Sequence, residues 1–206
     1  MKITITAKGL RPFLRLLQTG MILRVPQGTS VRETLVKHFG MDPAYLENRI
    51  QTLFLNGKRK PVDDLDAAVV AEGSVLALSA AMPGLVGATL RRGSYLAAMR
   101  QCIEAGAPPP GTGKTPVRVT VKLFNMVAKE LGPERLTAGI VVDGSTFHAF
   151  LKDEEAVLRK DGLKITVDAC LRRERGRQGG PVSLPDVLSM DLRGKDLFLR
   201  IDAAAS

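Results

Sequence analysis

The chain has 206 residues, a length that suits two domains of about 100 residues each. Aromatic residues make up only 4% of it and Trp is absent, which argues against a surface of exposed rings for stacking single-stranded nucleic acid. The formal charge of +9 is concentrated in residues 1–100, which hold 14 Lys and Arg against 7 Asp and Glu. A solvated basic surface is the ordinary explanation of this excess, and attraction of nucleic acid or an acidic partner is the functional one.

Cysteine use and the first residues favour a cytoplasmic protein. Cys102 and Cys170 are far apart and have no metal or redox spacing, so we expect neither a disulfide framework nor a metal site. Residues 1–7 alternate between apolar and polar side chains, unlike a secretory signal. Residues 73–90 carry no charge, but Gly, Pro and Ser interrupt them, so a buried strand and an apolar loop are expected there instead of a membrane helix.

The first half of the chain predicts strands around one helix. Alternating side chains predict a strand at 1–6 and a second one at 22–25. A helix is expected from Ser30, because Ser30 and Glu33 have the spacing of a capping box, in which each side chain bonds the other residue's amide. The stripe that this helix would lay on the sheet consists of Val31, Leu35 and Phe39.

A hairpin and a last strand follow the helix. Residues 51–55 predict a strand, Asn56-Gly57 a two-residue turn, and residues 58–62 a return strand that Pro61 restricts to an edge. Residues 74–78 predict the closing strand. A helix at 95–104 and a stiff, proline-rich spacer are expected before the second half.

The second half repeats this order without a gap as far as the helix when Met1 is set against Val117, and the two copies diverge after it. Strands are expected at 117–122, 138–141, 163–169 and 197–201. The intervening helix, capped by Ser145 or Thr146, would bury Phe147, Phe150 and Leu151. An Arg-rich insertion, expected to be a flexible loop, separates the last two strands.

The run Leu55-Asn-Gly-Lys58, with Val62-Asp63 and residues 70–78, resembles the second half of the ubiquitin-like sulfur carriers of molybdopterin and thiamine synthesis. The resemblance covers about the first 90 residues and, more faintly, residues 117–203. It implies an α+β fold with two tandem β-grasp domains, each a mixed sheet packed on one main helix. We therefore predict a first domain at 1–93, a linker at 94–116 and a second domain at 117–206.

The family's chemistry resides in a free Gly-Gly tail that an activating enzyme adenylates, and only glycine passes a narrow cleft without a side-chain clash. Neither copy ends in such a tail, since the chain continues after Gly84 and Gly87 and the second copy ends in Ala-Ala-Ala-Ser206. One alternative is a precursor of a carrier or modifier that a peptidase cuts between Gly84 and Gly93, with Gly93 as the processing site. An activating enzyme or that peptidase would then be its partner.

Three other motifs carry less weight. Residues 109–115 look like part of a phosphate-binding loop, but Pro108 stands where that loop needs glycine and a strand follows instead of a helix. His38 and His148 form no metal or catalytic spacing, and surface or helix-end positions are expected for both. Acidic groups such as Asp153-Glu-Glu155 are expected to be solvated caps.

The sequence thus predicts a non-catalytic scaffold or adaptor that binds a protein and needs no cofactor and no metal. Two contact regions are expected, one because apolar side chains are costly in water and the other because guanidinium groups on a loop bind anionic groups. Their residues are Met82, Leu85, Val86, Leu90, Arg91, Arg92, Arg172, Arg173, Arg175 and Arg177. A nucleic-acid-binding accessory role is a second alternative, and it predicts steeply salt-dependent binding.

Overall fold

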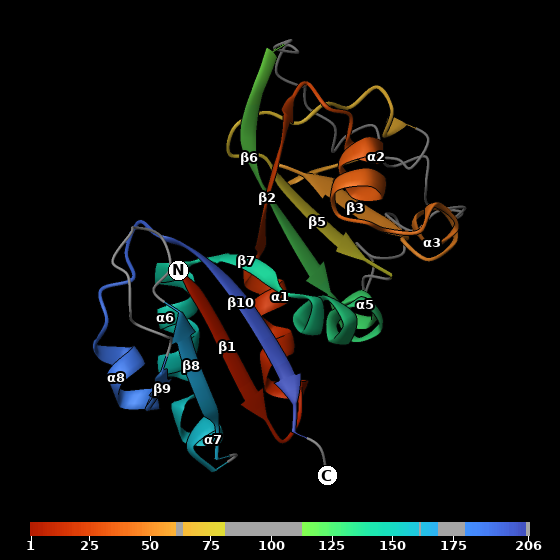
Figure 1. The fold of residues 1–206 in the computed structure, drawn as a ribbon. Coiled ribbons are helices and arrows are strands. Elements are labelled where there is room, and N and C mark those ends of the chain that lie inside the picture. Colours follow the sequence, from red (N-terminus) through yellow and green to blue (C-terminus); the bar gives the residue numbers. More distant parts are fainter. Residues whose placement is uncertain (61–63, 81–112, 161, 169–179, 205–206) are drawn as a thin grey trace. The chain divides into compact units, whose positions relative to one another are not determined.

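The computed structural model describes residues 1–60, 64–80, 113–160, 162–168 and 180–204 (Figure 1). It is an α+β protein with two five-stranded mixed sheets, as predicted at the level of fold class. The strands are β1 (Lys2–Ala7), β2 (Met21–Gln27), β3 (Thr52–Leu55), β4 (Lys58–Arg59), β5 (Val75–Ser79), β6 (Gly113–Phe124), β7 (Ile140–Asp143), β8 (Lys164–Asp168), β9 (Gly180–Val182) and β10 (Asp196–Ala203). The helices are η1 (Arg11–Phe13), α1 (Leu14–Thr19), α2 (Val31–Glu33), the π-helical turn η2 (Thr34–His38), α3 (Pro43–Asn48), α5 (Asn125–Ala138), α6 (Gly144–Asp153), α7 (Glu155–Lys160) and α8 (Leu184–Ser189).

The chain forms two compact units that are not consecutive in sequence. Unit 1 consists of Met1–Met21 and Lys129–Ser206, and unit 2 of Ile22–Ala128. This division differs from the predicted domains at 1–93 and 117–206. The difference arises because β1 and β6, which were expected to open the first and second domains, each pair with strands from the other half of the chain.

The sheet of unit 2 has the order β2-β6-β5-β3-β4. β6 runs parallel to β5, and β3 runs antiparallel to β5 on its other side. The side chains on one face are buried aliphatics, and the predicted helix stripe of Val31, Leu35 and Phe39 is buried as well. This core face comprises Leu53, Leu55, Leu76, Leu78, Val121 and Leu123.

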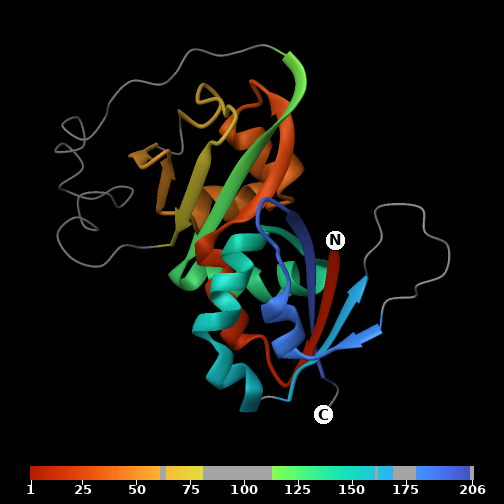
Figure 2. The same cartoon turned by 90° about the vertical axis from the view of Figure 1, so that its left-hand side faces the viewer.

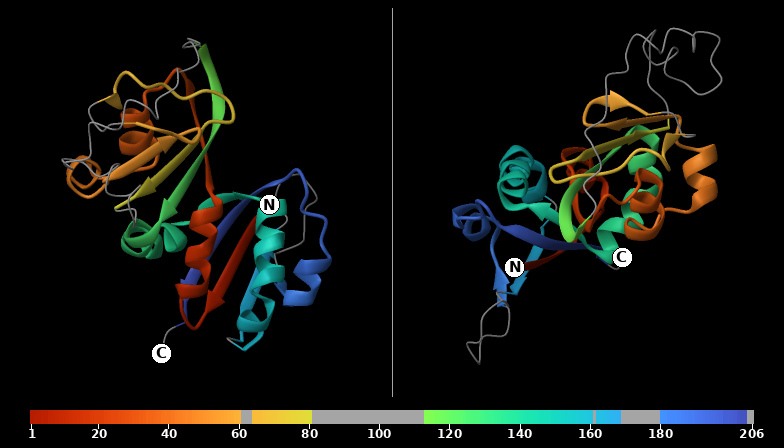
Figure 3. Two further views of the ribbon diagram at one scale, coloured as in Figure 1. Left: turned by 180° about the vertical axis from the view of Figure 1, so that it is seen from behind. Right: turned by 90° about the horizontal axis from the view of Figure 1, so that it is seen from above.

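The sheet of unit 1 has the order β7-β10-β1-β8-β9. The N-terminal strand β1 lies in its centre, parallel to β10 and antiparallel to β8. Helices α1 and α6 lie on one face of this sheet (Figures 1, 2 and 3). The ring of Phe13, at the end of η1, lies 5.9 Å from the ring of Phe150 in α6 between centroids. Phe147, Phe150 and Leu151 are buried as predicted.

The sequence predicted where the helices at Ser30 and near Ser145 begin, but the capping hydrogen bonds at both starts differ from those expected. The Ser30 hydroxyl accepts from the Glu33 amide at 3.1 Å, as expected, whereas the Glu33 carboxylate accepts from Lys37 Nζ at 2.9 Å instead of reaching back to Ser30. The cap of α6 is Asp143 and not Ser145 or Thr146: its carboxylate accepts from the Thr146 amide at 3.0 Å. The acidic residue two positions before Ser145 binds the Thr146 amide well, because its charge strengthens the bond.

The hairpin and the start of β6 test two further predictions. Asn56 and Gly57 have φ values of 53° and 77°, the left-handed conformation that a tight hairpin needs, and β3 and β4 pair across them. β6 begins at Gly113, so the predicted linker extends four residues into a strand, because residues 113–116 continue the pairing segment. The helix expected at 95–104 and Pro61 lie outside the described residues.

Candidate binding surfaces

All of the predicted contact residues lie outside the described part of the chain. They are Met82, Leu85, Val86, Leu90, Arg91, Arg92, Arg172, Arg173, Arg175 and Arg177, together with the processing site Gly93. Their roles therefore remain predictions. The described residues nevertheless contain two hollows, one in each unit, that the sequence did not indicate.

The first hollow lies on the outer face of the unit 2 sheet, the face opposite the aliphatic core. Phe54, Ala77 and Lys122 stand opposite one another across β3, β5 and β6. Because side chains alternate along a strand, Val75 and Phe124 project from the same face. Together these side chains line a cavity of about 500 Å³, whose wall also includes Gly57, Leu78, Ser79 and Asn125.

One end of this cavity is held by a side-chain bond. Asn125 has a φ of 52° where β6 passes into α5. Its side-chain Nδ2 donates to the Ser79 hydroxyl at 3.2 Å. The bond fixes the end of β5 against the end of β6. Ser79 pairs with Phe124, so the ring that closes this end of the cavity is anchored by the same strand ladder.

The outer face is apolar in its middle and basic around it. Phe54, Val75, Ala77 and Phe124 are half-buried, neither enclosed in the core nor fully in water. By strand alternation, Arg118 and Lys122 belong to this face as well, and so does Arg59, which is only 5% exposed. An apolar centre with charged surroundings is the usual composition of a protein-binding patch.

The corresponding face of the unit 1 sheet is polar. Lys2, Thr4 and Thr6 project from it along β1. On the neighbouring β10, Arg200 Nε donates to Asp202 Oδ1 at 3.0 Å, and the ammonium of Lys2 lies 6.0 Å from the ring centroid of Phe198. The two units therefore differ on this face, and the apolar cavity belongs to unit 2.

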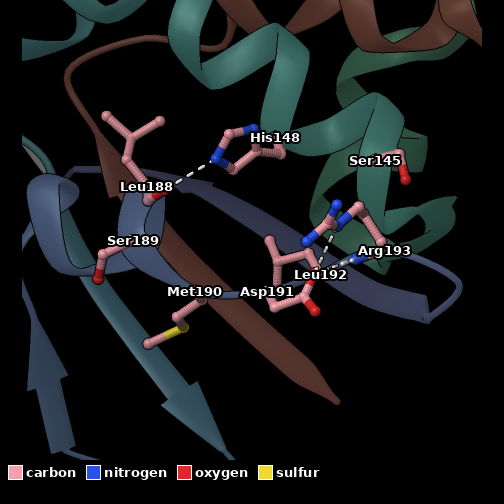
Figure 4. Close-up of a pocket in the computed structure, with 8 residues that line it drawn as sticks. All are labelled: Ser145, His148, Leu188, Ser189, Met190, Asp191, Leu192 and Arg193. Atoms are coloured by element: carbon pink, nitrogen blue, oxygen red, sulfur yellow. Dashed lines mark hydrogen bonds and ion pairs between the residues drawn. The ribbon is translucent and has the colours of Figure 1, made fainter.

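The second hollow, of about 480 Å³, lies in unit 1 between α6 and the segment that joins α8 to β10 (Figure 4). His148 Nε2 is 2.8 Å from the carbonyl oxygen of Leu188. Because a carbonyl oxygen only accepts, this ring nitrogen carries a proton and donates it. The lining residues are Ser145, His148, Leu188, Ser189, Met190, Asp191, Leu192 and Arg193.

The polar groups of this second hollow bind their own segment. Arg193 Nε donates to Asp191 Oδ1 at 3.0 Å, and this hydrogen bond lowers the pKa of Asp191 and raises the pKa of Arg193. The Ser189 hydroxyl donates to the carbonyl oxygen of Asp186 at 2.7 Å. These hydrogen bonds hold a connecting segment in place. They do not pair a nucleophile with a general base, as a catalytic site would.

A glycine lets the segment approach α6 so closely. The Gly144 amide donates to the Lys195 carbonyl at 2.8 Å, and a Cβ at position 144 would stand 2.0 Å from the Leu192 carbonyl oxygen. The Gly144 contact and the His148 bond fix the two ends of the hollow. His148 lies inside α6, where it is half-buried and binds the last turn of α8, instead of standing at a helix end. His38 does end η2 and is exposed.

Two further searches cover the described residues alone. No group of three or more His, Cys, Asp or Glu side chains there is placed to hold a metal ion. Among the same residues no helix is both long and apolar enough to cross a membrane. Comparison with protein-family models, with curated proteins and with solved structures finds no significant match.

Proposed function

We propose that the chain is a non-catalytic binding protein built on two β-grasp modules, and that the outer face of the unit 2 sheet holds its protein partner. The β-grasp assignment is supported by the resemblance of residues 55–78 to the sulfur carriers. It is also supported by mixed sheets that each pack on helices. The binding function rests on a single observation, the apolar cavity at Phe54, Ala77 and Phe124.

The partner is expected to contact this face through one apolar side chain that acidic residues flank. The cavity gives room for one large apolar group, whose burial would contribute roughly 1.5–3 kcal/mol. The half-buried Arg118 and Lys122 on the same face would attract carboxylates around that group and repel a basic segment. The apolar side chain would supply binding free energy, and the positive charge on the face would select an acidic partner.

Short synthetic peptides with one Leu or Phe between Glu residues test the proposal. Binding to the full chain is measured by fluorescence polarisation and located by amide chemical shifts. Ala77→Arg fills the cavity and is expected to weaken binding at least about tenfold, which corresponds to about 1.4 kcal/mol. Thr4→Arg, at the centre of the outer face of unit 1, is the matched control and is expected to leave binding unchanged.

Three results would contradict the proposal. One is equal binding of peptides in which Lys replaces Glu, and another is binding that survives Ala77→Arg. The third is binding of a single-stranded oligonucleotide with steep salt dependence, which would favour the nucleic-acid role. The intact mass of the protein from its host separates the carrier precursor, which would end at a glycine between Gly84 and Gly93.

A further inference from the structure

The two strands that cross between the halves of the chain are equivalent in pattern. With Met1 set against Val117, residues 2–7 of β1 correspond to residues 118–123 of β6. Both strands lie between two others in their sheets, and both bury every second side chain. Each therefore satisfies the general requirements of the position that the other one occupies.

Most of the matched core residues differ by a single methyl group. Ile3 corresponds to Val119 and Ile5 to Val121, and all four side chains are fully buried. An exchange at these two positions would change the packed volume very little. These positions consequently give neither strand a strong preference for one sheet.

One matched position differs much more. Leu123 is fully buried in unit 2, opposite Leu78 of β5. Its counterpart Ala7 is 1% exposed in unit 1 and stands opposite Ala203 of β10. Alanine in place of Leu123 would leave a cavity, and leucine in place of Ala7 would overpack the site that holds this buried alanine.

We propose that β1 and β6 compete for the same two positions, and that the size difference between Ala7 and Leu123 decides which sheet each strand joins. Separation along the chain does not decide it. A doubling of loop length changes a closure equilibrium by only about a factor of three. The fit of one buried side chain outweighs that factor, because both misplacements, a void and an overpacked site, occur together when the strands exchange.

A reporter with three engineered cysteines measures the choice in the full chain. Ala77→Cys on β5 stands opposite Lys122→Cys in the observed pairing and opposite Thr6→Cys in the exchanged one. Cys102 and Cys170 are changed to Ser, and the two alternative disulfides are counted by mass spectrometry after digestion. The 77–122 disulfide is expected to exceed the 77–6 disulfide at least about tenfold, which corresponds to about 1.4 kcal/mol.

The combined variant Ala7→Leu with Leu123→Ala is expected to shift this ratio at least about tenfold toward the 77–6 disulfide. A folded variant, judged by circular dichroism, with an unchanged ratio would overturn the proposal, as would equal disulfides in the parent. Should the combined variant fail to fold, Ala7→Val with Leu123→Val makes the two strands alike at this position. That milder pair is expected to bring the ratio near one, and an unchanged ratio there would also overturn the proposal.

Discussion

Unit 2 is a continuous stretch of chain, and this continuity gives a sharp prediction about its excision. A protein of residues 22–128 contains every strand of the β2-β6-β5-β3-β4 sheet except Met21, the first residue of β2, and is expected to fold by itself. A protein of residues 22–112 lacks β6 and is expected not to fold. The shorter protein also lacks the buried Val127 and Ala128, and from β6 it loses four buried side chains, Val117, Val119, Val121 and Leu123. At roughly 1.5–3 kcal/mol each, they amount to about 6–12 kcal/mol, which equals the whole stability of an ordinary domain.

Far-UV circular dichroism and urea unfolding of both proteins check this reasoning. The 22–128 protein should unfold in one cooperative transition, and the 22–112 protein should show no transition at all. A cooperative 22–112 protein would show that β6 is not part of the core of unit 2. An unfolded 22–128 protein, beside a folded full chain, would show that unit 2 depends on the rest of the chain.

Further predictions concern the full chain. Gly144→Ala places a methyl group against the Leu192 carbonyl and should cost about 1–3 kcal/mol in urea unfolding, whereas Gly9→Ala, with open space around it, should cost little. Phe13→Ala should cost about 3–5 kcal/mol by the same measurement, because the whole ring is buried. The Ser183 hydroxyl lowers the pKa of Asp186, so the stability from this cap is complete above the ordinary Asp pKa and is lost as pH falls through the lowered one. Asp186→Asn should flatten that part of the dependence of melting temperature on pH.

Each of these predictions has a result that would count against it. A Gly144→Ala variant as stable as the parent would mean that the segment after α8 moves away from α6 at no cost in free energy. A small effect of Phe13→Ala would mean that Phe13, at the end of η1, does not contribute to the core of unit 1. An unchanged pH dependence in Asp186→Asn would mean that the capping bond contributes nothing in solution.

The sequence indicated the strands other than β9, and the starts of two helices, because each depends on neighbouring residues. Alternation located β1 and β6, and the Asn56-Gly57 pair located the hairpin between β3 and β4. α5 was missed, since Pro133 interrupts it and its buried residues form no continuous stripe. The sequence of β6, the strand that precedes α5, gave no sign that a helix follows.

The pairing of the strands could not be derived in the same way. The patterns of β1 and β6 are so alike that alternation fits either strand to either sheet. The cavity on the outer face of unit 2 was missed for a related reason. Phe54 and Phe124 are far apart in sequence, and only the order of β3, β5 and β6 brings their faces together. The signal that could have found it was a large apolar residue, Phe54 in β3 and Phe124 in β6, at a strand position that faces away from the core.

The central place of β1 in unit 1 has a consequence for synthesis. A ribosome makes Ala7 about 196 residues before Ala203, the residue that it pairs with in β10. At about 5–20 residues per second, the first strand waits on the order of 10–40 s for this neighbour. Unit 2 is complete well before then, so the nascent chain carries a finished module behind an unpaired aliphatic strand. Until β8 and then β10 are made, this strand has no partner of its own sheet on either side.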